Sequence, residues 1–306
     1  MPREPAIRLE QLTKFYGRRL GVRDISFEVN PGEVVGFLGP NGSGKTTVLR
    51  SIMGLLRPTS GQAQLFGVDV QESGIHGREH TGYLPGTLSL YERMTASSYL
   101  RFIAAMRRRD CSRRIDELCE RFAVDRSVRI SEMSKGNKQK VGVVQAFMHD
   151  PDLLVMDEPT SGLDPLVQSE FDDLLRESTA RGAAVLLSSH VMSEVERLAS
   201  RVAIVNKGVM VAFDRVDVMK DRATVTIVLE FSREVDPHQL ADVPGFVVTR
   251  SDGSVVTGVM RGPEAALLRR ALDLGLVAVR SPEQTLDQLF RDLVSPGPKP
   301  PSGRAA

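Results

Sequence analysis

Residues 39–47 of this chain read Gly39-Pro40-Asn41-Gly42-Ser43-Gly44-Lys45-Thr46-Thr47. The stretch matches the pattern G-x-x-x-x-G-K-[ST] in full, and apolar runs lie before it (34–38) and after it (47–52). The first run predicts a strand that enters a loop, and the second predicts a helix that leaves it. Glycines let successive backbone N–H groups turn toward one anion, and the helix N-terminus adds its dipole. The stretch is therefore predicted to bind the phosphates of a nucleotide.

Two side chains of this loop have predicted roles of their own. The Lys45 ammonium can reach the β- and γ-phosphates, and the Thr46 hydroxyl is free to bind Mg²⁺. A nucleotide and Mg²⁺ are thus the expected cofactors. The candidate nucleotide contacts in the loop are Gly39, Pro40, Asn41, Gly42, Ser43, Gly44, Lys45, Thr46 and Thr47.

Length and composition limit the possible classes of protein. The chain has 306 residues, of which 41% are hydrophobic, and this suits one large domain with a smaller one. Its formal charge of +1 gives no general attraction to nucleic acid, so none is expected as a partner. No run approaches the ~18 apolar residues of a membrane span, and we expect a soluble, intracellular chain. Cys111 and Cys119 are expected to be free thiols.

The segments around the loop predict an N-terminal β-layer and a helical insertion. Strand patterns at 7–12 and 25–29 precede the loop, and another follows at 63–66, whereas 81–86 is expected to be a loop. Tyr16, at the rim of the β-layer, either stacks on a purine base or packs in the core. Helical spacing begins near residue 95, and we expect the insertion over about 95–148. Its arginines, such as those at 107–109, alternate with acids, which favours a solvated helix face over a nucleic-acid patch.

Two later strands end in residues that can act on phosphates. The apolar run 153–157 delivers Asp157 and then Glu158 at its C-terminal end, where ligands bind in an α/β sheet. Asp157 is placed to hold Mg²⁺ through water, and Glu158 to orient or deprotonate a water that attacks the γ-phosphate. The strand predicted over 183–189 ends at His190, which by itself is more often a structural residue than a ligand contact.

This ordered set resembles the ATP-binding subunit of an ABC transporter over roughly residues 5–215. The resemblance implies ATP as the nucleotide, adenine stacking on Tyr16, a metal site at Thr46 and Asp157, and catalysis by Glu158 with His190 as the γ-phosphate switch. Residues 161–164 match the family's dimer loop. Ser134 and Gly136 match the serine and second glycine of its Ser-Gly-Gly-Gln signature, although lysine and asparagine replace two other positions. The family usually has a glutamine or glutamate after residues 82–85, and here that position is Gly86.

The chain beyond residue 220 predicts a second, smaller domain. From about residue 223 the pattern reads β-α-β-β-α-β, which is the ferredoxin-like motif, with a last helix at 286–294. We therefore expect an α/β fold of the P-loop NTPase class with an N-terminal antiparallel β-layer and a helical insertion, followed by a small α+β ferredoxin-like domain. The expected boundaries are 1–220, 221–295 and a disordered tail at 296–306. The small domain has a weaker resemblance to those of drug- and antibiotic-exporting ABC ATPases.

The predicted function is ATP hydrolysis that powers a separate transmembrane permease, exporting a drug, antibiotic or lipid-like compound. The expected partners are a second ATPase subunit, in a homodimer, and the permease, which would hold the chain at the cytoplasmic face of a bacterial membrane. A non-transport ABC ATPase acting on ribosomes or DNA is the alternative, although such proteins usually carry a second ATPase half or a long coiled coil. A signalling GTPase would need Asn-Lys-x-Asp, and the sequence at 206–209 lacks the acid.

Overall fold

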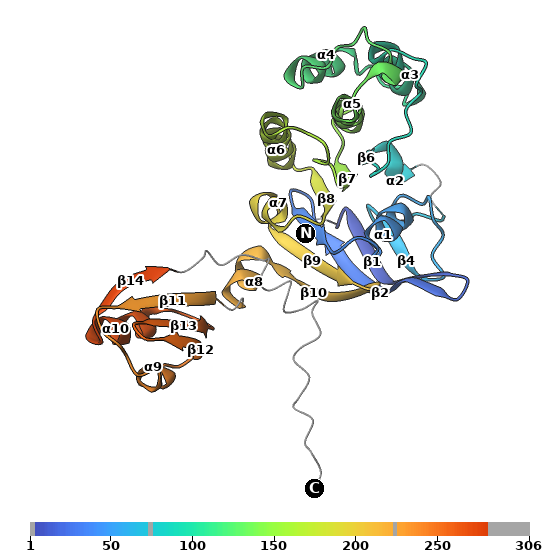
Figure 1. The fold of residues 1–306 in the computed structure, drawn as a ribbon. Coiled ribbons are helices and arrows are strands. Elements are labelled where there is room, and N and C mark those ends of the chain that lie inside the picture. The colour runs from blue at the N-terminus through green and yellow to red at the C-terminus, as the bar shows by residue number, and fades with distance from the viewer. Residues whose placement is uncertain (1–3, 73–75, 223–224, 281–306) are drawn as a thin grey trace. The chain divides into compact units, whose positions relative to one another are not determined.

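The computed structural model describes residues 4–72, 76–222 and 225–280 (Figure 1). These residues form two compact units, the first ending at Phe213 and the second beginning at Asp214. The boundary expected from the sequence, 220/221, lies slightly later. The expected final helix at 286–294 and the tail at 296–306 lie outside the described residues.

The first unit is built on one ten-stranded sheet with the order β5-β4-β1-β2-β10-β9-β3-β8-β7-β6. The strands β5, β4, β1 and β2 pair antiparallel and form the expected N-terminal layer, whereas β9, β3, β8, β7 and β6 are parallel. The ten strands are β1 (Ile7–Tyr16), β2 (Arg19–Val29), β3 (Val34–Leu38), β4 (Ser60–Leu65), β5 (Val68–Asp69), β6 (Thr81–Leu84), β7 (Leu153–Asp157), β8 (Ala184–Ser189), β9 (Arg201–Asn206) and β10 (Val209–Arg215).

Helix α1 (Lys45–Ile52) lies inside the curl of this sheet and contacts strands of both its antiparallel and parallel parts (Figure 1). Its apolar residues Val48, Leu49 and Ile52 are fully buried in the core cluster that the two parts share. Helix α7 (Met192–Leu198) packs against β3 and β8. It approaches β3 so closely that a Cβ at Gly36 would lie 2.4 Å from Val195 Cγ1. The strand entering the phosphate loop is therefore fixed by packing along its length.

The prediction of a loop over 81–86 is wrong for its first four residues, which form the edge strand β6. This strand pairs in parallel with β7, with Thr81 opposite Leu153. Gly82 lies against helix α5 (Lys135–Phe147), where a Cβ would be 2.2 Å from the Ala146 carbonyl oxygen. Glycine and proline lower the strand propensity of this segment, but tertiary pairing and close helix packing override it.

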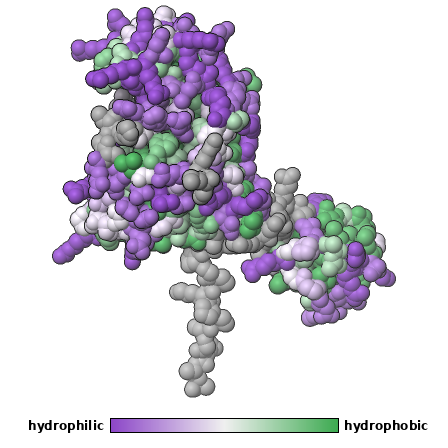
Figure 2. All heavy atoms as spheres, turned by 180° about the vertical axis from the view of Figure 1, so that it is seen from behind, coloured by the Kyte–Doolittle hydropathy of each residue, from purple (hydrophilic) through white to green (hydrophobic). Residues whose placement is uncertain are grey.

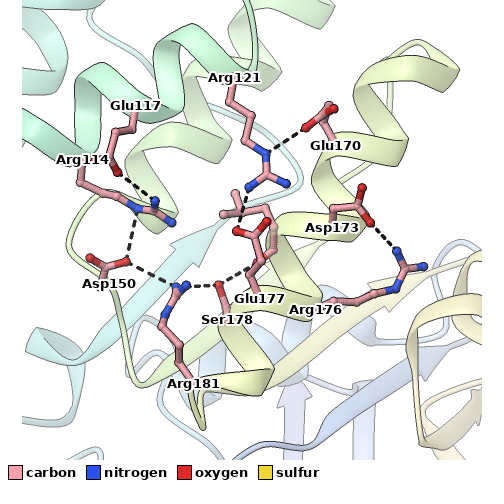
Figure 3. Close-up of polar contacts among 11 residues, drawn as sticks. Arg114, Glu117, Arg121, Asp150, Glu170, Asp173, Arg176, Glu177, Ser178 and Arg181 are labelled. Atoms are coloured by element: carbon pink, nitrogen blue, oxygen red, sulfur yellow. Dashed lines mark hydrogen bonds and ion pairs between the residues drawn. The ribbon is translucent and has the colours of Figure 1, made fainter.

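The helical insertion contains α3 (Ala96–Met106), α4 (Ser112–Arg121), a 3-10 helix (Ile130–Glu132) and α5, all within the expected limits. Ion pairs connect α4 to helix α6 (Pro165–Ala180), because Arg121 contacts Glu170 at 2.9 Å and Glu177 at 2.8 Å (Figure 3). Hydrophilic side chains cover most of the insertion's visible face (Figure 2). The solvated face expected for the arginines fits Arg113, whose side chain is 94% exposed. Arg107 instead turns inward and contacts His149 and the Thr81 carbonyl.

The second unit has the ferredoxin-like order β-α-β-β-α-β after a short helix, α8. Its antiparallel sheet has the strand order β12-β13-β11-β14. Apolar residues of both helices, among them Leu240 and Leu267, pack with Ile227 and Leu229 from one face of the sheet. Some apolar side chains remain exposed, Val247 and Leu272 among them, and Figure 2 shows a hydrophobic area on this unit. The elements are α8 (Val216–Arg222), β11 (Val225–Phe231), α9 (His238–Ala241), β12 (Phe246–Asp252), β13 (Val255–Met260), α10 (Ala265–Asp273) and β14 (Leu276–Arg280); the first unit also has α2 (His76–Glu79).

Candidate nucleotide-binding site

The register of the parallel strands brings the candidate residues to one edge of the sheet. β8 lies between β3 and β7, so that Leu38 is opposite Ser189 and Asp157 is opposite Ser188. The phosphate loop leaves the end of β3, and Glu158 and His190 follow the ends of β7 and β8. Loops that are more than 100 residues apart in sequence therefore meet at the carboxyl ends of these strands, where α/β proteins bind ligands.

The phosphate loop has the geometry of an anion cradle. Gly42 and Gly44 have φ values of 81° and 109°, which favour glycine. The Lys45 side chain is only 6% exposed, and its ammonium donates to the Gly39 carbonyl at 2.7 Å. No side chain caps the N-terminus of α1, and the buried Ser43 hydroxyl has no hydrogen-bond partner among the described residues. These unpaired donors fit a phosphate group.

A cavity of about 440 Å³ opens beside this loop. Tyr16 stands at its wall, 49% exposed, with its hydroxyl 3.3 Å from Thr47 Oγ1. The ring lies close against Gly21, where a Cβ would be 2.9 Å from the ring. An aromatic face that is half open to a cavity can stack on a base. The cavity is lined by Tyr16, Arg19, Leu20, Gly21, Asn41, Gly42, Gly44, Lys45, Thr46, Thr47 and Glu158.

Thr46 and Asp157 form a pair of oxygen donors. The Thr46 hydroxyl donates to Asp157 Oδ2 at 2.7 Å, and the Ser188 hydroxyl donates to Asp157 Oδ1. Asp157 is only 3% exposed. A hydroxyl beside a carboxylate fits Mg²⁺, which takes oxygen ligands and usually keeps phosphate and water oxygens in its shell. The described residues contain no cluster of three or more histidine, cysteine or carboxylate side chains that could hold a metal ion by themselves.

Glu158 differs in backbone conformation from the other non-glycine candidate residues. Its φ is 50°, in the left-handed region that a glutamate rarely adopts, and such strain is common at functional sites. Its N–H donates to the carbonyl and hydroxyl oxygens of Ser188, both at 3.1 Å. Its carboxylate lies between the His190 imidazole and the Lys45 ammonium, with Oε2 2.8 Å from His190 Nδ1 and Oε1 3.5 Å from Lys45 Nζ. One carboxylate thus links the phosphate lysine to the predicted switch histidine.

The signature residues Ser134 and Gly136 lie at the start of α5. Ser134 is the N-cap and accepts a hydrogen bond from the Asn137 N–H at 3.2 Å. Gly136 lies close to the predicted dimer loop, since a Cβ there would be 2.7 Å from the Gly162 carbonyl oxygen. Neither residue lines the cavity beside Lys45. The structure therefore brings Tyr16, the phosphate loop, Asp157, Glu158 and His190 together, and leaves the signature outside this cluster.

Gly86 lies beside the candidate metal ligand. A Cβ at this position would be 3.1 Å from Asp157 Oδ2, closer than most real contacts. The neighbouring Tyr83 is also affected by this carboxylate. Burial raises the pKa of the Tyr83 hydroxyl most, the charge of Asp157 raises it further, and Arg50 opposes the rise. The absence of a side chain at residue 86 thus affects the space directly around Asp157.

Sequence reasoning missed two groups of residues at this site. Arg19, Leu20 and Gly21 line the cavity because the turn between β1 and β2 lies over the phosphate loop. A Cβ at Gly44 would lie 2.9 Å from the Gly21 carbonyl oxygen, which shows the close approach. Ser188 contacts both Asp157 and Glu158. The Gly21 position carried no signal, but Ser188 precedes His190 by two residues at a strand end and could have been flagged.

Comparisons with known proteins identify the family of this chain. The ABC transporter family matches residues 22–161. The chain is 37% identical over 224 residues to the probable multidrug ABC transporter ATP-binding protein YbhF of Escherichia coli, which covers 72% of this chain but only 39% of that relative. It is 32% identical over 294 residues to the Nod factor export ATP-binding protein I of Rhizobium etli, covering 94% of this chain and 92% of the relative. A solved structure described as the ATP-binding subunit of an ABC transporter superposes with a TM-score of 0.67 at 32% identity, covering 70% of this chain and 92% of the other.

The site and the fold define an ATP-binding cassette with an ABC ATPase domain. The chain belongs to the ATP-binding proteins of ABC transporters. No helix among the described residues combines the length and the apolar character needed to cross a lipid bilayer.

Proposed function

We propose that this chain hydrolyses ATP to drive a separate membrane permease that exports a drug, antibiotic or lipid-like compound. The observation that carries the proposal is the connected cluster Lys45–Glu158–His190, which lies beside the Thr46–Asp157 pair. The names of the relatives, a multidrug transporter protein and a Nod factor export protein, support export. The chain would act at the cytoplasmic face of a bacterial membrane, held there by the permease.

In this proposal each residue of the cluster has one task. Lys45 and the N–H groups at the start of α1 bind the phosphates, and Tyr16 holds the base. Thr46 and Asp157 would hold Mg²⁺, which when bound neutralises charge on the phosphates. Glu158 orients the attacking water and accepts its proton, and His190 holds the Glu158 carboxylate toward the γ-phosphate position.

We further propose that two copies enclose the nucleotide between them. Ser134 and Gly136 lie at the N-terminus of α5, which has the polarity to bind a phosphate, yet they do not line their own chain's cavity. A second copy can supply them. The phosphate loop of one copy and the α5 N-terminus of the other would then hold the same γ-phosphate.

The experiment that tests the transport role captures the complex in an ATP-bound state. A tagged Glu158→Gln chain is expressed in its native host, membranes are solubilised with ATP and Mg²⁺, and the bound proteins are identified. We expect one multi-span membrane protein in stoichiometric amount. The matched control, Lys45→Ala with Glu158→Gln, should lose ATP-dependent recovery of that protein because it cannot hold the phosphates. Recovery of ribosomal proteins or DNA in its place would refute the transport role and favour the non-transport alternative.

A further inference from the structure

Glu194 on helix α7 connects the two loops that carry Glu158 and His190. Its Oε1 accepts a hydrogen bond from the Thr160 hydroxyl at 2.6 Å, and its Oε2 accepts one from the Ser189 hydroxyl at 2.7 Å. Thr160 and Ser189 are only 4% and 2% exposed. Hydrogen bonds to an ionised carboxylate are shorter and stronger than those between neutral groups, and both distances are short.

The two hydroxyl donors are close in sequence to the residues proposed to act in hydrolysis. Thr160 comes two residues after Glu158, and Ser189 comes directly before His190. The Ser189 hydroxyl also accepts from the Val191 N–H at 2.9 Å, which closes a tight turn around His190. One carboxylate therefore fixes the segment after β7 against the C-terminal end of β8.

The Glu158 backbone needs such restraint. Its left-handed conformation persists only if the surrounding contacts determine it, and Ser188 supplies contacts on one side at the Glu158 N–H. Thr160, held by Glu194, supplies the restraint on the other side of Glu158. The same carboxylate holds Ser189 and so keeps the His190 ring 2.8 Å from Glu158.

We propose that Glu194 is a positioning residue for ATP hydrolysis, which holds the Glu158 carboxylate and the His190 imidazole in register without touching the nucleotide. The inference rests on the proposed function, because it assigns Glu194 to the reaction that Glu158 and His190 carry out. Glu194 lines no part of the cavity beside the phosphate loop, so we expect its replacement to change kcat more than nucleotide affinity.

The test compares Glu194→Gln with a control that loosens the same helix elsewhere. Asp172 of α6 is 4% exposed and pairs with Arg197 of α7, so Asp172→Asn removes a buried carboxylate that anchors α7 away from Glu158. We expect Glu194→Gln to lower kcat by roughly 10- to 10²-fold, the range that a displacement of about 1 Å can cause. For Glu194→Gln, KM and nucleotide affinity should stay within about two-fold of wild type. Asp172→Asn should keep kcat within about two-fold of wild type, even where it lowers Tm as much as Glu194→Gln does.

Two further variants separate positioning from general destabilisation. Thr160→Val replaces the hydroxyl by a methyl group and should lower kcat as Glu194→Gln does. Thr160→Ser keeps the hydroxyl and should keep kcat near the wild-type value. In a Glu158→Gln background, Glu194→Gln should lower kcat by less than about two-fold further, because a positioning residue has no effect without the group that it positions.

The proposal is overturned if Glu194→Gln keeps the wild-type kcat, if Asp172→Asn lowers kcat by the same factor, or if Thr160→Val is as active as Thr160→Ser. The proposal is also overturned if Glu194→Gln lowers kcat in the Glu158→Gln background by the same factor as in the wild-type chain. A wild-type chain without any ATPase activity would overturn the proposed function together with this inference, and that outcome is distinguished by the wild-type assay alone.

Discussion

Replacing Glu158 by glutamine tests the centre of the proposed mechanism. The change keeps the size of the side chain but removes its charge and its ability to accept a proton from water. The carboxylate is 25% exposed and lies 2.8 Å from His190 Nδ1 and 3.5 Å from Lys45 Nζ. Loss of a positioned general base lowers rates by ~10²- to 10⁴-fold. The lower limit corresponds to about 2.7 kcal/mol of activation free energy.

The same geometry predicts the effect on nucleotide binding. At the 3.5 Å separation of Lys45 and Glu158, the Coulomb attraction is about 5 kcal/mol with an effective dielectric constant of ~20. Screening at a partly exposed carboxylate and desolvation offset most of this, and the net contribution is about 1 kcal/mol. Because the amide no longer competes with phosphate for Lys45, ATP affinity should be unchanged or up to roughly five-fold tighter, which is that ~1 kcal/mol.

Two assays measure these effects separately. Steady-state phosphate release with ATP and Mg²⁺ gives turnover, and titration with a fluorescent nucleotide gives affinity. Glu177→Gln is the matched control, since it makes the same chemical change on α6, where Glu177 pairs with Arg121 and does not line the cavity. The reasoning is refuted if Glu158→Gln turns over within a few-fold of wild type, or if it loses ATP binding while the control keeps it.

Three further changes test other parts of the molecule. Ser134→Arg in the Glu158→Gln background should abolish ATP-induced dimers in size-exclusion light scattering, because the arginine would block the α5 N-terminus; persistent dimers would contradict the two-copy arrangement. Truncation after Arg222 should keep nucleotide affinity, since the cavity residues all precede it, but should weaken self-association or permease coupling; loss of ATP binding in a folded truncated chain would show that the second unit belongs to the site. Burial and then Arg107 lower the pKa of His149 from 6.5 to about 3, so the unfolded chain binds a proton that the folded chain does not, and stability falls as the pH drops through this window. His149→Gln should therefore lose less Tm than wild type between about pH 7 and about pH 5, and an equal loss would contradict the buried neutral imidazole.

Much of the site could be predicted from the sequence because its residues belong to short local sequence patterns. The phosphate loop needs glycines at particular backbone conformations, and the structure has Gly42 and Gly44 with positive φ. A buried parallel strand is a continuous apolar run, and Asp157 at its end is where the sequence analysis places it. The β-α-β-β-α-β order of the second unit followed from the alternation of strand and helix patterns in the same way.

The parts that could not be predicted depend on contacts between distant segments. The cavity wall at Arg19 and Gly21 exists because the β1–β2 turn is brought over the phosphate loop, and no local pattern reports that approach. Strand β6 contains a glycine that packs against α5, so its propensity argued for a loop while its pairing with β7 made it a strand. The position of Ser188 near a strand end could be noticed in the sequence, but its contact with Asp157 follows from the register that sets the two residues opposite each other.

Gly86 shows how the structure changes the meaning of a departure seen in the sequence. Read alone, the glycine only removes a side chain that the family usually uses at the metal. In the structure its Cα lies so close to Asp157 that even a Cβ would crowd Oδ2 at 3.1 Å. Asp157 is already held on both oxygens, by Thr46 and by Ser188. Because these two hydroxyls orient the carboxylate without a side chain at residue 86, the glycine is compatible with the proposed Thr46–Asp157 metal site, whose remaining ligands we expect to be water and phosphate oxygens.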